Sequence, residues 1–473
     1  MAKEKTETKK NAAAAPEKST AKMRPARKKP VSVIRKDSKC VTEIKTYVIE
    51  RDATAERKRF KNIIIEGDIE RIGDKAFSFC EKLETVEIRD GVKEIGEEAF
   101  SHCPNLTSVV IPDSVEEIKD EAFSHCPNLT SVVIPDDLKA IYPGAFVGSG
   151  MDLIRKGELL SAKKRTGKIR IPAGVDHIWP GVYKNCKQLT SVTIPEGVEC
   201  IGGEAFANCT GLTSIKLPKS IREIDPDAFG GCTGLTEVKI PDGVEYLVDN
   251  PFAGCTGLKS DLIWHGMLLF LKKRAGKVTI PDGVESIEAK VFAGCKRLTE
   301  VKIPDGVTYI GSEAFKNCTN LTSVVIPDGV TEIFWKAFAG CTSLKSVVIP
   351  DSVTELGNGA FTGCTGLNSV VLSKSLKSID WDVFSGCTSL KSVVIPDGVE
   401  IIYEKAFYDC ASLASVVIPD SVRAIESGAF LGCLSLREVT VPRNAKIAVA
   451  KSSPHPDRRV LPAFGVTPKI TRK

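Results

Sequence analysis

The chain has 473 residues, of which 42% are apolar and 26% are charged, so it can bury a large core. No apolar stretch approaches the roughly 18 residues that a membrane-spanning helix needs. Sixteen cysteines are spread over this long chain with only five histidines, which excludes a short disulfide scaffold and leaves few residues for a catalytic site.

The first 39 residues form a basic segment. They hold 13 Lys or Arg against 4 Asp or Glu and contain no aromatic residue, a composition that cannot offset chain entropy by apolar burial. We therefore predict a disordered N-terminal tail over residues 1–39. Such a tail can neutralise phosphates, which makes nucleic-acid association a weaker alternative function. The candidate residues for polyanion contact are Arg24, Arg27, Lys28, Lys29, Arg35 and Lys36.

The N-terminal segment lacks the pattern of a targeting signal. Its longest run of small apolar residues is Ala12 to Ala15, and Glu4 and Glu7 argue against a transit peptide. We expect a cytoplasmic protein, with the cell surface reached by a non-classical route as the alternative. Residues 40–59 are expected to cap the domain that follows.

A repeat of 23 residues begins at Phe60 and continues to Ser435 in fifteen units. One column of the repeat is almost always cysteine, with Ser149 as its exception, and an aromatic residue stands three positions earlier in every unit. The cysteines are Cys80, Cys103, Cys126, Cys186, Cys209, Cys232, Cys255, Cys295, Cys318, Cys341, Cys364, Cys387, Cys410 and Cys433.

Each unit resembles residues 106–128, and its apolar pattern changes period partway along. Val109 and Ile111 alternate as in a short strand, which Pro112 ends because proline cannot donate to a strand ladder. A turn follows, and the later apolar residues, Val115 to Cys126, are spaced as in a short helix or 3₁₀ segment. We predict one solenoid coil per unit, with parallel strands about 4.8 Å apart.

Two insertions interrupt the repeat, at residues 152–165 and 258–274. Asp152-Leu153-Ile154, Gly157 and Leu159-Leu160 recur 109 residues later as Asp261-Leu262-Ile263, Gly266 and Leu268-Leu269. Two apolar pairs around a glycine predict a hairpin in each insertion.

The unit resembles the leucine-rich repeats, and more narrowly their BspA-like, Treponema-type class, whose units read leucine, a strand ending in Ile-Pro, Val-x-x-Ile, Ala-Phe and cysteine. The resemblance implies an α/β repeat solenoid over residues 60–442, with a parallel concave sheet and hairpin insertions. Residues 443–473, which are basic and contain proline, are then a C-terminal tail.

The cysteine column has structural and chemical interpretations. Its fixed place beside a core aromatic favours buried, free thiols, because cysteine packs as a small hydrophobe. Cys40 and Cys200 fall outside the column. The spacing of histidine and cysteine does not suit zinc, and no nucleophile–base arrangement or phosphate loop is evident. We expect no metal, no cofactor and no enzymatic activity.

The strands should expose their third and fifth positions. The fifth column ends in five consecutive valines, which suggest an apolar binding strip, although copying of one unit would produce the same residues. The candidate partner-binding residues are Val325, Val348, Val371, Val394 and Val417, with Ser323, Ser346, Ser369, Ser392 and Ser415 beside them.

These observations favour a non-enzymatic scaffold that binds a protein partner on the concave face of the solenoid. The resemblance implies a rival function, because BspA-like proteins are commonly cell-surface proteins that contact host proteins or other cells. The residues name neither the partner nor the oligomeric state.

Overall fold

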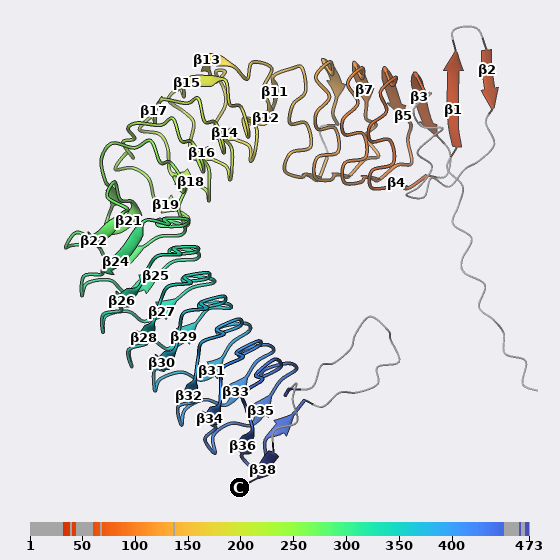
Figure 1. The fold of residues 1–473 in the computed structure, drawn as a ribbon. Coiled ribbons are helices and arrows are strands. Elements are labelled where there is room, and N and C mark those ends of the chain that lie inside the picture. The colour runs from red at the N-terminus through yellow and green to blue at the C-terminus, as the bar shows by residue number, and fades with distance from the viewer. Residues whose placement is uncertain are drawn as a thin grey trace, which may run out of the picture.

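The computed structural model describes residues 32–37, 40–43, 60–66, 69–135, 138–448, 463–464 and 469–472. The chain winds into a parallel-strand solenoid of about 17 turns of roughly 23 residues, which confirms the predicted solenoid and its period and adds to the fifteen units of the repeat. The coils stack into a long arc with the N-terminal coils at one end and the C-terminal coils at the other (Figure 1).

The first strands of neighbouring coils stack in parallel, paired over several stretches of the array, and we call this stack the outer ladder. Its register is one unit, so that Val348 lies opposite Val371. Its strands are β3 (Asn62–Glu66), β5 (Thr85–Ile88), β7 (Ser108–Val110), β9 (Ser131–Val133), β13 (Gly167–Arg170), β15 (Leu189–Thr193), β17 (Ser214–Lys216), β22 (Gly276–Thr279), β24 (Leu298–Lys302), β26 (Ser323–Val325), β28 (Ser346–Val348), β30 (Ser369–Val371), β32 (Ser392–Val394), β34 (Ser415–Val417) and β36 (Glu438–Val441).

A second stack, the inner ladder, is made of two-residue strands that follow the proline turn. Most of them present one buried aliphatic residue to the core, such as Ile310 or Ile333. Its strands are β4 (Arg71–Ile72), β6 (Glu94–Ile95), β8 (Glu117–Ile118), β10 (Ala140–Ile141), β14 (His177–Ile178), β16 (Cys200–Ile201), β18 (Glu223–Ile224), β19 (Tyr246–Leu247), β23 (Ser286–Ile287), β25 (Tyr309–Ile310), β27 (Glu332–Ile333), β29 (Glu355–Leu356), β31 (Ser378–Ile379), β33 (Ile401–Ile402), β35 (Ala424–Ile425) and β37 (Lys446–Ile447).

In each coil the segment from the inner-ladder strand to the next outer-ladder strand, which we call the return, is built from turns. The sequence predicted a short helix or 3₁₀ segment there, but none of the described residues is helical. Two residues of the return have positive φ in many coils, for example Lys75 and Phe79 at 57° each, and left-handed residues end a helix. The backbone N–H groups of Lys75, Phe77 and Phe79 instead donate to carbonyls of the next coil. Stacking thus uses the hydrogen bonds that a helix would keep within itself.

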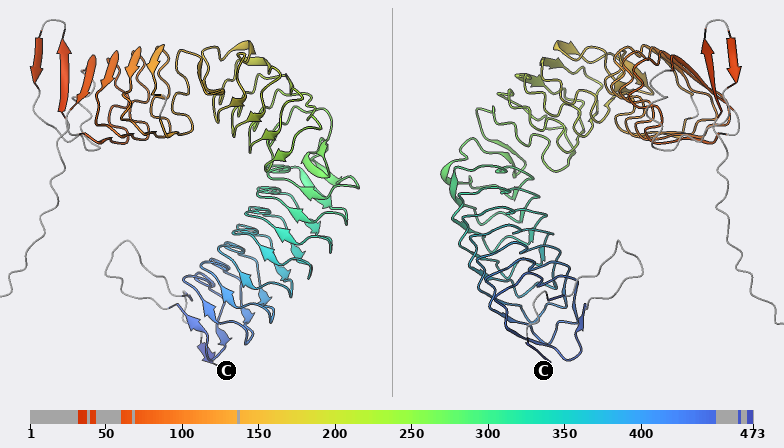
Figure 2. Two further views of the ribbon diagram at one scale, coloured as in Figure 1. Left: turned by 180° about the vertical axis from the view of Figure 1, so that it is seen from behind. Right: turned by 45° about the vertical axis from the view of Figure 1, so that its right-hand side comes forward.

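The outer ladder lies along the outer side of the arc and the inner ladder along its inner side (Figures 1 and 2). The sequence analysis expected the longer strands on the concave side, and this expectation is wrong because they lie on the convex side. A leucine-rich sheet curves inward where wide helices separate the coils on the opposite side, and no described residue of this chain is helical. The outer ladder is also broken between β26 and β28 and between β30 and β32.

A column of stacked aromatic rings runs through the core. Phe292 to Phe430 stack face to face along consecutive coils, with ring centroids 4.9–5.6 Å apart. Their side chains are fully buried. Because each ring from Phe315 to Phe407 contacts a ring on both sides, the aromatic column couples these coils to their neighbours.

Both predicted hairpins are present. Strands β11 (Leu153–Arg155) and β12 (Glu158–Ser161) pair antiparallel, as do β20 (Leu262–Trp264) and β21 (Met267–Phe270). Their turns, Lys156-Gly157 and His265-Gly266, have positive φ at both residues, which a type I′ turn requires. The second strand of each hairpin joins the inner ladder, so the insertions divide the core into three clusters.

Strands are present at both ends of the array, within segments expected to be tails. β1 (Ser32–Asp37) pairs with β2 (Cys40–Glu43) and, antiparallel, with β3. At the other end β37 continues the inner ladder, Phe464 stacks on Phe430 at 5.2 Å, and β38 (Lys469–Arg472) pairs with β36. The array therefore extends beyond residue 442, and residues 1–31 lie outside the described part of the chain.

Candidate binding surfaces

The cysteine column has a structural role. Eleven of its thiols in the described ranges donate to the carbonyl oxygen of the preceding coil's aromatic residue, as Cys341 Sγ does to Phe315 O at 3.2 Å. Burial raises the pKa of Cys318 and of Cys364 to about 12, which keeps these thiols protonated and unreactive. All cysteines of the column in the described ranges are free, as the sequence predicts.

No group of three or more His, Cys, Asp or Glu residues able to hold a metal ion occurs within the described ranges. The same ranges contain no helix long and apolar enough to cross a membrane.

The five candidate valines lie on the outer ladder with their side chains exposed. Their exposed fractions run from 56% for Val417 to 71% for Val325, whereas the preceding residue of each strand points inward, as Val347 does at 2%. This alternation is the orientation predicted from the sequence. With rungs about 4.8 Å apart, the valines form an apolar strip roughly 20 Å long, which we call the valine strip.

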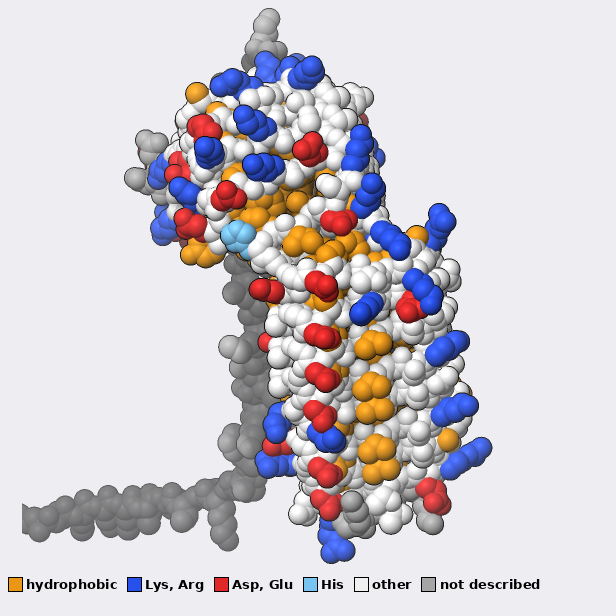
Figure 3. All heavy atoms as spheres, turned by 90° about the vertical axis from the view of Figure 1, so that its left-hand side faces the viewer, with side chains coloured by type: hydrophobic (Ala, Val, Ile, Leu, Met, Phe, Trp, Pro, Cys, Tyr) orange, Lys and Arg blue, Asp and Glu red, His pale blue; other side chains and the backbone are white. Residues whose placement is uncertain are grey.

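Two further columns border the valine strip. The serines that begin β26, β28, β30, β32 and β34 are all exposed. Three residues after the valines come exposed carboxylates in most coils, and Figure 3 shows an acidic row running beside the apolar column. Its members in the C-terminal half are Asp328, Asp351, Asp397 and Asp420, with Lys374 in the remaining coil bonded to Asp351 at 3.0 Å. The strip is therefore apolar with an acidic flank.

The predicted polyanion residues cannot be placed as a site. Arg24, Arg27, Lys28 and Lys29 lie outside the described residues. Arg35 and Lys36 belong to β1, in register with β2. Nucleic-acid binding by these residues stays a prediction.

A group of exposed aromatic residues on the inner side of the arc was not predicted. Phe334, Trp335 and Trp381 are 40–45% exposed, and the Trp381 and Tyr403 rings lie 4.3 Å apart. The Lys336 ammonium lies 4.4 Å from the centre of the Trp335 ring. Both tryptophans stand three residues before a core phenylalanine, at a column that other units fill with small or polar residues, and that contrast is the available sequence signal.

One carboxyl group is buried in the inner ladder. Glu288 is 3% exposed, and its Oε1 accepts hydrogen bonds from Ser286 Oγ at 2.7 Å and from the Tyr309 hydroxyl. Burial raises the pKa of Glu288, an effect that the two hydrogen bonds partly offset and nearby Asp249 reinforces.

Replacing Glu288 with glutamine is expected to stabilise the protein at neutral pH. A carboxyl whose pKa is higher in the folded state favours folding when protonated, and that contribution is lost as the pH rises through the folded-state pKa. Glutamine keeps a hydrogen-bond acceptor without the charge. Urea unfolding at about pH 4 and about pH 7.5 measures the difference, which should appear only at the higher pH. Glu355→Gln, at an exposed inner-ladder position, is the matched control, and a less stable Glu288→Gln protein at neutral pH would contradict the assignment.

The repeats match a protein-family model, the BspA type leucine rich repeat region, over residues 47–162, 158–267, 266–379 and 331–451. These ranges cover most of the chain. None of the curated proteins compared with it matches.

Several solved structures are similar to this chain. A leucine-rich cell surface protein from Faecalibacterium prausnitzii is 24% identical, over 84% of this chain and 92% of that one, with a TM-score of 0.34. A leucine-rich repeat protein from Bacteroides ovatus is 27% identical over 88% and 94%, with a TM-score of 0.35. The T. pallidum leucine-rich repeat protein is 33% identical over 36% of this chain and 82% of that one, with a TM-score of 0.33.

Proposed function

Because this chain belongs to the BspA-type leucine-rich repeat family, we propose that it is a non-enzymatic scaffold that binds a protein partner through the outer ladder of its C-terminal half. The observation that carries this proposal is the valine strip. Five apolar side chains in consecutive coils are more than half exposed, and contiguous apolar surface of this kind is typical of interaction sites.

The composition of the strip supports binding. The first exposed position of each rung is serine, whose hydroxyl costs less to desolvate than a charged group. Equivalent positions in the middle of the array carry Lys216 in β17 and Lys302 in β24, both exposed, so an outward lysine is compatible with the strand. The fold therefore does not require valine at this column.

The acidic row indicates the chemistry of the partner. A segment that buries apolar side chains on the valine strip would lie beside Asp328, Asp351 and Asp397, so a positively charged flank would complement it. We therefore expect the partner to contribute an apolar segment bordered by Lys or Arg.

Replacing Val348, Val371 and Val394 together with lysine is expected to abolish partner recovery while leaving the protein folded. Three unpaired ammonium groups would have to be buried in the complex, at a cost of several kcal/mol in total. Affinity capture with the full chain, followed by direct binding to the purified partner, measures the loss. Circular dichroism and thermal unfolding confirm folding of each variant.

The matched control replaces Val110 and Val133 with lysine. These valines occupy the same position in β7 and β9 and are 44% and 57% exposed, but they lie in the N-terminal coils. Partner recovery should survive in this control. Unchanged recovery by the folded triple variant would show that the C-terminal valines are products of repeat duplication.

An intracellular scaffold and a cell-surface adhesin would bind their partners on different sides of the cell envelope, so the location of the protein distinguishes them. Protease treatment of intact cells that leaves the protein whole supports an intracellular scaffold. Degradation under the same conditions would support a cell-surface adhesin instead.

A further inference from the structure

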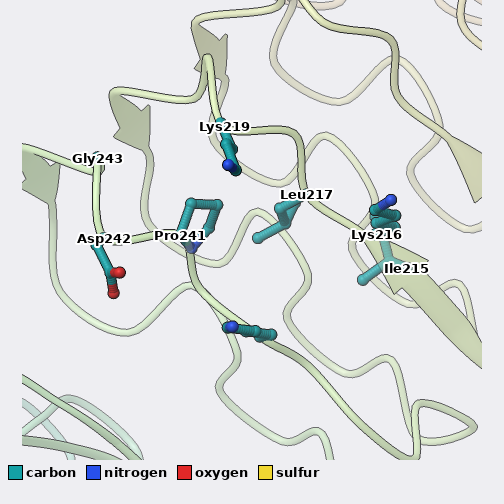
Figure 4. Close-up of a pocket in the computed structure, with 8 residues that line it drawn as sticks. Ile215, Lys216, Leu217, Lys219, Pro241, Asp242 and Gly243 are labelled. Carbon is teal, nitrogen blue, oxygen red and sulfur yellow. The ribbon is translucent and has the colours of Figure 1, made fainter.

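A pocket of about 540 Å³ opens in the outer ladder between β17 and the coil that follows it. Its floor is apolar and comes from Ile215, Leu217 and Pro241. Figure 4 shows Leu217 between Pro241 and the Ile215–Lys216 pair, with Lys219 approaching above it. The pocket lies outside the valine strip, which begins at Val325.

The pocket exists because the outer ladder stops at β17. Residues 237–239 occupy the strand position of the next coil but form no strand, and the sheet order ends β13-β15-β17. The backbone of the two coils is joined at the edge of this gap, where Thr236 N donates to Thr213 O at 3.2 Å. Both segments belong to the described residues, and no backbone hydrogen bond joins residues 214–217 to residues 237–240. The backbone at the pocket edge therefore lacks the strand pairing that joins β15 to β17.

Three lysines surround this apolar floor. Lys216, Lys219 and Lys239 line the pocket with exposed side chains, and none of them takes part in an ion pair within residues 138–448. Lys277 on the same ladder differs, because its Nζ lies 2.9 Å from Glu300. Among the eight described residues that line the pocket, Asp242 alone carries a carboxylate, so positive charge predominates there.

We propose that this pocket binds an acidic peptide segment, with a carboxylate held by Lys216 and Lys239 and an adjacent aliphatic side chain on Leu217 and Pro241. The unpaired lysines supply the charge complementarity. An extended peptide can place an aliphatic side chain on the apolar floor and pair its backbone with the open edge. A sulfated sugar or a phosphate would make neither contact, so the pocket favours the peptide. The proposal does not depend on the valine strip, whose flank carries the opposite charge.

The test uses the full chain and a short, fluorescein-labelled peptide in which glutamate alternates with leucine. Fluorescence anisotropy should show saturable binding that weakens with added salt, because the lysines are exposed. The double variant Lys216→Gln/Lys239→Gln should bind at least about tenfold more weakly, since each lost lysine removes a charge-assisted hydrogen bond. The same peptide with glutamine in place of glutamate should not bind.

The matched control is Lys277→Gln/Lys302→Gln. It makes the same change in net charge on the same ladder but leaves the pocket intact, so its affinity should equal that of the unaltered chain. Equal weakening in the two double variants would overturn the proposal in favour of diffuse electrostatic attraction. So would failure of the glutamate peptide to bind, or preferential binding of heparin oligosaccharide or inorganic phosphate in place of the peptide.

Discussion

Replacing Phe338 with alanine is expected to destabilise the coils around it by about 3–5 kcal/mol. The Phe338 ring is fully buried and stacks between Phe315 at 5.0 Å and Phe361 at 5.2 Å, nearly parallel to both. Alanine would leave a cavity in the aromatic column that neighbouring rings cannot fill, because the backbone of each coil is hydrogen-bonded to the next.

Hydrogen–deuterium exchange with peptide resolution is the appropriate measurement for Phe338→Ala. Coils of a solenoid contact mainly their neighbours, so the loss should be largest in the coils next to Phe338 and fade along the array. Phe334→Ala is the matched control, because this phenylalanine is 40% exposed on the inner side and its loss should cost about 1 kcal/mol or less. Equal effects of the two substitutions would contradict the packing assigned to the column.

Replacing Asn250 with alanine is expected to cost about 2–5 kcal/mol at the junction around the second hairpin. Asn250 is 1% exposed, and its Nδ2 donates to Leu269 O at 2.8 Å and to Ala289 O at 2.9 Å. Its Oδ1 accepts from Phe252 N at 3.0 Å. One amide thus joins three segments that the insertion separates, and alanine would leave their buried polar groups unsatisfied.

The exposed Asn105 provides the control for this substitution. Its Nδ2 donates to Glu81 O at 2.6 Å, but water can replace that bond, so Asn105→Ala should cost about 1 kcal/mol or less. Urea unfolding and protease sensitivity of residues 250–290 should separate the two variants. A stable Asn250→Ala protein with an intact junction would show that other contacts hold the hairpin in place.

The sequence alone determined the unit of the fold. The spacing of Phe338, Cys341 and their copies defined the period and the core columns, because a solenoid coil contacts the same positions of its neighbours. The alternation around Val348 also predicted which strand residues face outward, since side chains alternate across a strand. Two apolar pairs around Gly157 and around Gly266 were sufficient to predict the hairpins.

Tertiary structure decided the features that depend on how coils stack. The spacing from Val115 to Cys126 suits a helix, but hydrogen bonds between coils replace those within one and leave turns with positive φ. Without helices the strands of the outer ladder lie on the outer side of the arc, so the curvature did not follow from the repeat. The lysine-lined pocket arises because residues 237–239 leave the ladder, although their sequence resembles that of strands such as β24. Pairing in a long stack is set by the path of the whole array, and a single unit does not contain that information.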